Sequence, residues 1–534
     1  MKRKLCLILS VVMVFSLLSA CSNQPGPKAT TTQNDLSALG TLPIVTKPVA
    51  LTIMTHQGYG FQLVPSNDLK IYGEAGKLLG INIKWETAPG ANLHELITTR
   101  LAANINLPDL ICMSTFTHSD VFNYGKTGVI KEITKDLFAQ NAPGLNAYYL
   151  KDPAAKIARI DSEGKMWALP DSIVFRKEFQ DGFMLNDRWM KELNLTVPTT
   201  TDELYNVLMA FKTKDPNKNG KADEIPLVNL WSTLDFMGDS WDMSLNSGGA
   251  FGYTTHDDGT VTCDLTAPKM KDYFTYMNKL YKDGLLDKEF SNTTMDTLAA
   301  KVKNNRVGGM IEWILFSNQF DVMVDPAAAD FSKVVYPVIK QPKAGPQYKA
   351  QRFMRTGTVG DWVITSAAKR PDVAIRFVDA ILTNQKMMDL ITYGIEGVTY
   401  KVVNGVKKLS IPSADFSKMG GMEWALPNRQ SGWDESFAGP KEDSDKANNR
   451  TILTKEPFPE VAQTADQQAI LKKYATDVNT YFQEERAKFI TGDEPLSNFD
   501  KYVTEIKKRG TEDLLKVYQE LYKTAMEAKA KLGK

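Results

Sequence analysis

The feature that most constrains the fold is a repeated alternation of strand-like and helix-like segments. Val49 to Met54 has strand character, Asp68 to Leu79 has helical spacing, and Ile81 to Trp85 alternates with a period of two. A helical stretch at 93–103 and a short apolar strand at 107–111 follow. Parallel strands need a crossover of a dozen or more residues, usually a helix, so this alternation predicts βαβ units. It argues against sandwiches, solenoids and helical bundles.

The length of the chain predicts two lobes. A single hydrophobic core stops growing at about 250–300 residues, and this chain has 534 residues, 43% of them hydrophobic. Helical runs at 201–212, 269–283 and 294–304 lead to a strand at 307–311. We expect these segments to build a second α/β lobe.

Changes of pattern predict that the chain passes between the lobes three times. The first crossing is expected at 161–175, where turn and strand signals mix. The strand at 334–338 is interpreted as a return to the first lobe, and 357–365 as a strand crossing back. The first lobe is therefore predicted to hold residues 49–165 and 325–360, and the second lobe residues 166–324 and 361–534. The charged, helical stretch from 462 to 534 is expected to cover the second lobe.

The amino terminus predicts export, with a signal peptide over residues 1–20. A basic start, Lys2 to Lys4, precedes an apolar run from Leu5 to Leu18, which is shorter than the about 20 residues of a membrane-spanning helix. Leu18-Ser19-Ala20-Cys21 then ends the segment as a lipobox. Cleavage before Cys21 leaves a thiol and an amine for fatty acyl chains such as palmitate, and two or more chains hold a protein stably at a membrane. The alternative is an ordinary cleaved signal with a chance cysteine.

The residues after Cys21 predict a tether. The stretch 21–48 is rich in Thr, Ser, Gln, Asn, Gly and Pro, and we expect a flexible segment that holds the body at the outer face of the cell membrane. Such a tether keeps a protein near a membrane partner at high local concentration, which favours a bacterium with a single membrane. The chain has no second long apolar segment.

Charge gives no sign of a nucleic-acid partner, and cysteine content excludes a disulfide scaffold. The 64 basic and 63 acidic residues give a net charge of +1, so no basic excess points to nucleic acid. With Cys6 in the signal and Cys21 lipidated, Cys112 and Cys263 remain in the body. A disulfide between them stays open, although free thiols are favoured because Cys112 lies in an apolar strand-like run.

The sharpest motif of the mature chain is an acidic loop at 215–226, Asp-Pro-Asn-Lys-Asn-Gly-Lys-Ala-Asp-Glu-Ile-Pro. Oxygen side chains at loop positions 1, 3 and 5, a glycine at 6 and a carbonyl at 7 suit Ca²⁺. The predicted ligands are five side chains and one backbone carbonyl, that of Lys221: Asp215, Asn217, Asn219, Lys221, Asp223 and Glu224. Position 12 is Pro226 in place of the bidentate Glu of an EF-hand, so Glu224 has to supply that carboxylate. We predict a structural calcium ion, with a solvated turn as the alternative.

Catalytic motifs are absent from the sequence. The four histidines, His56, His94, His118 and His256, stand singly, with no pair spaced for zinc. No Gly-x-Ser-x-Gly elbow and no phosphate-binding glycine loop occurs. A glycosidase needs only two facing carboxylates, which a sequence cannot exclude.

Tryptophans suggest an aromatic ligand site. Seven of the nine fall in or beside loops or strand ends, namely Trp167, Trp231, Trp241, Trp313, Trp362, Trp424 and Trp433. Exposed indole rings stack on the C–H faces of sugars, whereas buried rings pack in cores, and a single tryptophan fits either role.

Four segments in order carry a family resemblance. They are the acidic loop, Tyr276 to Leu286 (Tyr-Met-Asn-Lys-Leu-Tyr-Lys-Asp-Gly-Leu-Leu), Tyr393 to Tyr400 (Tyr-Gly-Ile-Glu-Gly-Val-Thr-Tyr), and a closing set at 489–492, 498–503 and 514–518. Together with the lipobox, these segments resemble the extracellular solute-binding lipoproteins of carbohydrate ABC importers. The long branch that includes alginate-oligosaccharide-binding proteins is the most similar, and the resemblance covers nearly the whole mature chain.

The resemblance implies a fold and a site. The fold is α/β, a two-lobe periplasmic-binding-protein-like (type II) architecture with hinge crossovers and a helical C-terminal extension. In that branch the acidic loop binds calcium. Sugar-binding residues follow no fixed motif in the family, so the ligand-binding candidates are side chains of suitable type near the expected crossings: Trp167, Trp231, Trp313, Arg352, Trp362 and Glu396.

The leading hypothesis is a monomeric binding lipoprotein with no enzymatic activity. A sugar or oligosaccharide would bridge the lobes and stabilise their closed state, which the transmembrane subunits of an ABC permease would recognise. The first alternative is a surface-anchored polysaccharide-degrading enzyme, a glycoside hydrolase or lyase. The second is an adhesive or structural lipoprotein, for which internal repeats are expected and none occurs.

Overall fold

The computed structural model describes most of the chain between residues 35 and 532. The described residues are 35–57, 66–113, 116–151, 153–161, 163–171, 181–230, 233–245, 250–256, 258–313, 334–336, 352–353, 361–403, 405–411, 413–421, 454–455 and 461–532. Within these ranges, no helix combines the length and the apolar character that a membrane span requires. The predicted signal peptide and Cys21 lie outside them.

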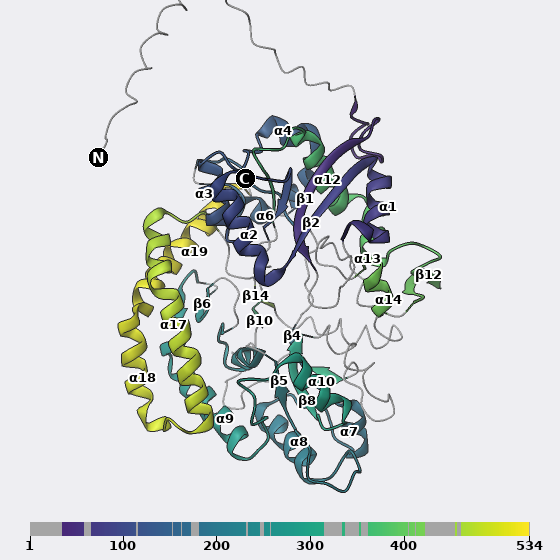
Figure 1. Cartoon of the computed structure of the whole chain (residues 1–534). Coiled ribbons are helices and arrows are strands. Elements are labelled where there is room, and N and C mark those ends of the chain that lie inside the picture. Colours follow the sequence, from purple (N-terminus) through teal and green to yellow (C-terminus); the bar gives the residue numbers. More distant parts are fainter. Residues whose placement is uncertain are drawn as a thin grey trace, which may run out of the picture.

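The described elements form two lobes, each built on a four-stranded sheet (Figure 1). The first sheet has the order β11-β3-β1-β2 and contains β1 (Val49–Gln57), β2 (Ile81–Pro89), β3 (Leu110–Cys112) and β11 (Trp362–Ile364). Strand β1 is parallel to β2 and to β3, and β11 is antiparallel to β3. The βαβ units predicted for this part of the chain are confirmed.

Helices cover both faces of the first sheet. The first-lobe helices are η2 (Ser66–Asp68), α1 (Lys70–Leu79), α2 (Gly90–Ala103), α3 (His118–Lys126), α4 (Lys135–Asn141), α5 (Pro143–Lys151), α6 (Pro153–Ile157), α12 (Pro371–Thr383) and α13 (Gln385–Tyr393). Ile53 packs with α1 and α12 in one buried cluster, whereas its neighbour Met54 packs with α2 and α3 in another. Side chains of successive strand residues point to opposite faces of a sheet. Two successive buried apolar residues in one strand therefore indicate that the sheet is covered on both faces.

Residues 35–47 contradict the predicted tether, because they form a strap folded against the first lobe. Ile44 and Val45 are buried in its core, and Arg370 donates two hydrogen bonds of 2.8 and 3.0 Å to the Asp35 carboxylate. Gly80 follows α1 with φ +72°, and its backbone lies against the strap. A Cβ at this position would be only 2.8 Å from the Cβ of Pro43. The polar average composition of 21–48 conceals these few apolar side chains. The part of the predicted tether that stays a prediction is therefore 21–34, which lies outside the described residues.

The second sheet has the order β5-β8-β4-β9. It contains β4 (Asp181–Leu185), β5 (Val228–Asn229), β8 (Gly309–Trp313) and β9 (Val334–Tyr336). Around it lie α7 (Asp187–Glu192), α8 (Thr201–Thr213), η3 (Thr233–Trp241), the hairpin of β6 (Tyr253–Thr255) and β7 (Val261–Cys263), η4 (Asp264–Thr266), α9 (Pro268–Lys282) and α10 (Met295–Lys303). Thr200 begins α8 with a capping box to Glu203, and Pro268 begins α9, where its missing N–H costs nothing.

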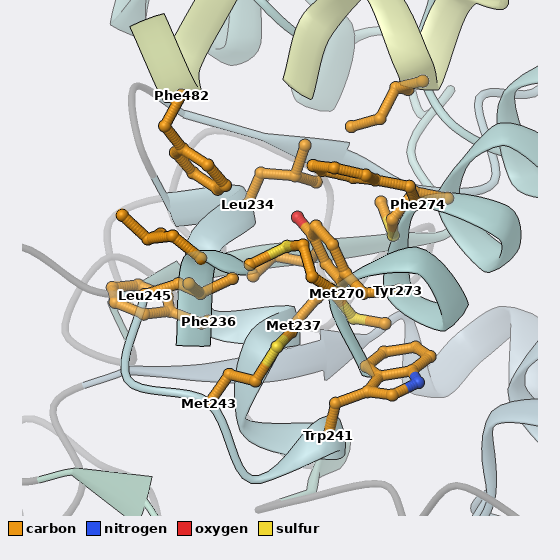
Figure 2. Packing of buried hydrophobic residues seen from close by; sticks show 14 of the residues in the cluster. Leu234, Phe236, Met237, Trp241, Met243, Leu245, Met270, Tyr273, Phe274 and Phe482 are labelled. Atoms are coloured by element: carbon orange, nitrogen blue, oxygen red, sulfur yellow. The ribbon is translucent and has the colours of Figure 1, made fainter. Parts of the chain in front are cut away.

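The C-terminal helices cover the second lobe, as predicted (Figure 1). They are α17 (Ala465–Thr491), η5 (Leu496–Asn498), α18 (Phe499–Ile506), the π-helical turn η6 (Lys507–Thr511) and α19 (Glu512–Leu532). Figure 2 shows the ring of Phe482 from α17 directed into the cluster that contains Leu234 and Phe274. Phe489 of the same helix stacks on Phe274 with centroids 4.8 Å apart. The second lobe and these helices therefore share one core.

The strand pairing corrects the predicted division between lobes. β9 pairs with β4 of the second sheet, although its segment was predicted to return to the first lobe. β11 pairs with β3 of the first sheet, although 361–534 was assigned to the second. Met166 to Leu169 also stay in the first lobe, since Leu169 and Trp362 exchange backbone hydrogen bonds. Short apolar strands look alike in sequence, and only pairing with distant segments decides which sheet they join.

The described elements change lobe three times, as predicted, but at other places. The first change falls between Asp171 and Asp181, the second between Tyr336 and Asp361, and the third between Gly421 and α17. The remaining elements are β10 (Arg352–Phe353), which pairs with β14 (Thr454–Lys455), the hairpin of β12 (Tyr400–Val403) and β13 (Val406–Leu409), and α14 (Ser413–Lys418). Cys112 in β3 and Cys263 in β7 are both free thiols, which confirms that expectation.

Candidate functional site

The two sheets present corresponding edges toward the middle of the molecule (Figure 1). In the first lobe, parallel β1, β2 and β3 end there, and antiparallel β11 begins there because Trp362 pairs with Cys112. In the second lobe, β8 ends there and β4 begins there, since Trp313 pairs with Asp181. We call these the first-lobe edge and the second-lobe edge. Ligands of open α/β sheets bind at the carboxyl ends of the strands, so a ligand between the lobes would contact both edges.

A buried ionic network occupies the first-lobe edge. Asp361, fully buried at the start of β11, accepts hydrogen bonds from Arg159 Nη2 at 2.6 Å and Nε at 3.0 Å. His118 Nε2, at the start of α3, lies 2.9 Å from the other carboxylate oxygen. Burial alone would raise the pKa of Asp361, but the Arg159 charge and His118 outweigh it and hold this pKa below its usual value. The network joins three separate parts of the first lobe next to the second crossing.

Three of the predicted aromatic platforms are core residues. Trp362 has no exposed surface and lies edge-on to Phe377 at 5.9 Å, so it offers no face to a sugar, and the predicted ligand contact is wrong for it. Trp167 is 6% exposed, and its indole N–H donates to Asp161 at 2.8 Å, which leaves it a packing role. Trp241 is buried in the second-lobe core (Figure 2). Each follows the general tendency of indole rings to dominate cores.

The other candidates stay predictions. Trp313 closes β8 at the second-lobe edge and Arg352 lies in β10, but only their backbones are described. Glu396 is exposed just before β12. Trp231 lies outside the described residues, as do Trp424 and Trp433 among the other tryptophans considered.

Sequence reasoning missed an aromatic pair at the first-lobe edge. His94, in the first turns of α2 after β2, is exposed and stacks on Phe116, which follows β3. The ring centroids are 4.3 Å apart and the planes differ by 22°. Phe116 is buried beneath it. The available signal was position: both residues come shortly after the carboxyl end of a parallel strand.

The acidic loop is folded tightly between α8 and β5. Asp215, Lys218 and Gly220 adopt left-handed backbone conformations, with φ of +45°, +57° and +71°. The Asp215 carboxylate accepts hydrogen bonds from the backbone N–H groups of Asn219 and Gly220, both at 3.1 Å. The chain thus wraps around the first carboxylate, as a cation-binding loop does.

The side chains of the acidic loop converge on its carboxylates. Asn219 Nδ2 donates to Asp223 at 2.9 Å, and this hydrogen bond lowers the pKa of Asp223. Oε1 of Glu224 is buried and has no hydrogen-bond partner among the described residues. Burial, followed by repulsion from Asp215 and Asp223, raises the pKa of Glu224.

A cation would compensate this arrangement. A buried carboxylate oxygen without a donor is costly unless it is protonated or binds a cation. The set of oxygens, two amides and three carboxylates with one carbonyl, suits a hard ion, so the residues present fit calcium. No group of three or more His, Cys, Asp or Glu side chains is placed to hold a metal anywhere in the described ranges. The fit therefore depends on the amide and carbonyl oxygens as well as on the acids.

The paired sheet edges and the three crossings define a class, the two-lobe binding proteins that hold a ligand between their lobes. The family model of the bacterial extracellular solute-binding proteins matches residues 74–388, more than half of the chain. The chain therefore belongs to this family.

Three curated relatives match most of the chain. The fructooligosaccharide ABC transporter substrate-binding protein FusA of Streptococcus pneumoniae is 27% identical over 549 residues, covering 95% of each chain. The polygalacturonan/rhamnogalacturonan-binding protein YtcQ of Bacillus subtilis is 25% identical over 467 residues, covering 83% of this chain and 86% of YtcQ. Lipoprotein LipO of the same organism is 23% identical over 419 residues, covering 76% and 82%. The chain is thus a solute-binding protein, in agreement with the leading hypothesis.

Solved structures confirm the predicted fold class. FusA in complex with kestose, at 22% identity, has a TM-score of 0.70 and covers 90% of this chain and 100% of its own. A FusA EF-hand mutant in complex with fructo-nystose gives the same values. The alginate-binding protein AlgQ2 without calcium ion, also 22% identical, has a TM-score of 0.69 and covers 91% of this chain and 100% of its own.

Proposed function

We propose that the chain is the substrate-binding lipoprotein of a carbohydrate ABC importer, which captures an oligosaccharide between its lobes and delivers it to a membrane permease. The observation that carries this proposal is the match to FusA over 95% of both chains, which spans both lobes and the C-terminal helices. YtcQ, named for binding acidic polysaccharides, supports a carbohydrate ligand. Ligand contacts with both edges would favour the closed arrangement by their differential affinity for it, and no bond is made or broken.

Calorimetry tests the ligand class. The purified mature protein is titrated with fructo-oligosaccharides and with acidic pectin-derived oligosaccharides, and ligand that co-purifies is identified by mass spectrometry. Binding of one series, with the sugar recovered intact, is the expected result. Reducing ends released from polysaccharide would favour the hydrolase or lyase alternative, and absence of binding throughout both series would overturn the proposal.

The His94–Phe116 pair gives a binding prediction. Replacing His94 with alanine should weaken oligosaccharide binding about tenfold, the size of a stacking contact, because an exposed ring on a buried support is suited to stack on a sugar. The melting temperature should stay the same. Glu95→Ala, an exposed change one residue away on α2, is the matched control. An equal affinity loss in both variants, or none in His94→Ala, would argue against the contact.

We also propose that the acidic loop binds a structural calcium ion. Asp215, Asn217, Asn219, Asp223 and Glu224 would hold it with the carbonyl of Lys221, and the ion would neutralise the crowded carboxylates. The unpartnered Glu224 oxygen supports this assignment, and so do the names of relatives that mention an EF-hand and a calcium ion.

Chelation tests the calcium ion. Removing calcium should lower the melting temperature of the wild type, because a bound ion stabilises the folded state. Asp215→Ala combined with Asp223→Ala should abolish this response, because the variant lacks two of the proposed ligands and no longer binds the ion. Asp202→Ala, an acid on the preceding helix α8, should leave the response intact. A wild type that is indifferent to both chelator and added calcium would refute the site.

Cys21 is proposed to carry the lipid anchor. The lipobox supports this, as does the relative named lipoprotein LipO. Cys21→Ala should shift the protein from the membrane fraction to the medium or should leave an uncleaved precursor, because a single acyl chain or none holds a protein only weakly. Cell fractionation with labelled palmitate incorporation measures this. Unchanged labelling in Cys21→Ala would place the acyl chain elsewhere.

A further inference from the structure

The β12–β13 hairpin projects from the first lobe on a rigid base (Figure 1). Buried Thr399 donates from Oγ1 to the Tyr393 carbonyl at 2.7 Å, and the Ser410 N–H donates to the Thr399 carbonyl at 2.8 Å. The Tyr400 ring lies 5.7 Å from that of Tyr393 at the end of α13. Lys407 pairs with Asp389 of the same helix. These contacts fix the base of the hairpin, so its outer part is held in a defined orientation.

The outer part of this hairpin is both apolar and basic. Val402 and Val403 of β12 are 51% and 47% exposed, and Val398, just before Thr399 at the base, is 47% exposed. These are three of the eight large hydrophobic side chains that are exposed in the described chain. Lys401 and Lys408 stand directly opposite each other on the two strands, and both are exposed. Neither makes an ion pair with any described residue.

This composition disfavours the isolated hairpin. Like charges directly opposite on neighbouring strands destabilise a sheet. Because successive strand residues point to opposite faces, Val403 shares the face of Lys401 and Lys408. Val402 lies on the other face with Lys407. An exposed aliphatic side chain beside two exposed lysines suits a contact surface. Both features become favourable against a surface that is negatively charged and has an apolar layer beneath. An anionic bilayer meets both conditions, because aliphatic side chains enter the headgroup boundary while ammonium groups lie among lipid phosphates.

The surrounding charges and the chain geometry agree with a lipid surface. From α13 to α14 the sequence has five lysines and three acidic residues, including exposed Glu396, in a chain that is nearly neutral overall. The folded strap begins at Asp35 on the same lobe, 14 residues after Cys21. Such a length spans at most about 50 Å. The proposed anchor therefore keeps the first lobe within reach of the bilayer.

We propose that the β12–β13 hairpin docks on the anionic lipid surface of the membrane, as a second contact beside the lipid anchor. This inference rests on the export and anchoring proposed above. Two points of attachment would restrict rotation of the first lobe and leave the second lobe free to close on a ligand. The anchor makes a weak hairpin contact sufficient, since tethering raises its effective concentration.

Vesicle co-sedimentation tests the hairpin contact without the anchor. The full mature chain carrying Cys21→Ala is mixed with vesicles of phosphatidylcholine alone or with added phosphatidylglycerol. We expect binding only to the anionic vesicles, and it should weaken as salt is raised. The double variant Lys401→Glu and Lys408→Glu should bind at least about twenty-five-fold more weakly, about fivefold for each lysine. It exchanges one like-charge pair for another, so its melting temperature should match the wild type.

Two further variants locate the contact. Val403→Ser, on the face of the two lysines, should also weaken binding. Lys135→Glu with Lys151→Glu, the same charge change at exposed lysines on α4 and α5, should not. Equal binding to neutral vesicles, no binding by the wild-type hairpin, or an equal loss in the α4 and α5 variant would overturn the proposal. Loss of transport in the hairpin variants with vesicle binding intact would also overturn it, in favour of a permease contact. Because Cys21 is absent from the protein used with vesicles, the vesicle results do not depend on the proposed anchor or ligand, whereas transport is measured in cells with Cys21 intact.

Discussion

Replacing Asp361 with alanine should lower the free energy of unfolding by about 3–5 kcal/mol, the cost of leaving a buried charge unpaired. Asp361 has no exposed surface, and Arg159, which binds it through two nitrogens, is itself only 12% exposed. The substitution would leave the Arg159 charge buried without its counterion and would remove the group that joins β11 to α3 through His118. Denaturant unfolding followed by circular dichroism measures the change.

A double-mutant cycle separates the ion pair from simple packing. Arg159→Met should also be destabilising, and combining it with Asp361→Ala should cost clearly less than the sum, because neither buried charge then remains. Asp136→Ala, an exposed acid on α4, should change stability by no more than about 0.5 kcal/mol. A loss below about 1 kcal/mol in Asp361→Ala would show that water or a shift of Arg159 compensates the charge.

The same network contributes to acid sensitivity. The pKa of Asp361 in the folded protein lies below the 3.8 of a free carboxyl, in the direction set by Arg159 and His118. Because this pKa is lowered, the stability contributed by the ionised Asp361 carboxylate is fully present above about pH 4. It is lost as the pH falls through the pKa that Asp361 has in the folded protein. Stability measured against pH should therefore fall less steeply on the acid side in Asp361→Asn than in the wild type.

The fold was predictable where local pattern determines structure. The alternation from Val49 to Ala103 specified β1, α1, β2 and α2, because each of these segments is long enough to show its period. Strand β3, with only three residues, was placed by its position after α2 in the alternation. Strands β9 and β11 were assigned to the wrong lobes. Three apolar residues fit either sheet, and their place depends on hydrogen bonds to partners far away in the chain, such as Val363 to Ile111.

The site was predictable to the extent that its chemistry is local. The acidic loop draws all its predicted ligands from ten consecutive residues, so its spacing alone indicated a cation. The network of His118, Arg159 and Asp361 spans 243 residues between His118 and Asp361, and no sequence pattern connects them. Tryptophan positions were misleading, since a ring at a strand end packs inward as readily as outward, as Trp362 does. The hairpin, in contrast, was open to prediction from Asn404-Gly405 between valines, a strong turn signal.

Phe482→Ala should destabilise the protein by about 3–5 kcal/mol, the usual cost of a large cavity in a core. Phe482 comes from α17 but has no exposed surface, because it packs among second-lobe residues (Figure 2). Its ring lies 5.4 Å from that of Phe251 in edge contact and 6.3 Å from that of Phe274. These neighbours belong to a chain segment more than 200 residues away, so the cavity would open between the C-terminal helices and the lobe they cover.

Because the cavity would open between the C-terminal helices and the second lobe, protease sensitivity shows whether the two unfold together. If the C-terminal helices and the second lobe form one cooperative core, Phe482→Ala should shift a single unfolding transition without making α17 to α19 selectively sensitive to protease. Phe482→Leu should recover more than half of the lost stability, since it restores most of the buried volume. Glu484→Ala, exposed two residues along the same helix, should be nearly neutral. Release of the C-terminal helices ahead of the lobe would show instead that they form a separate folding unit docked on a complete domain.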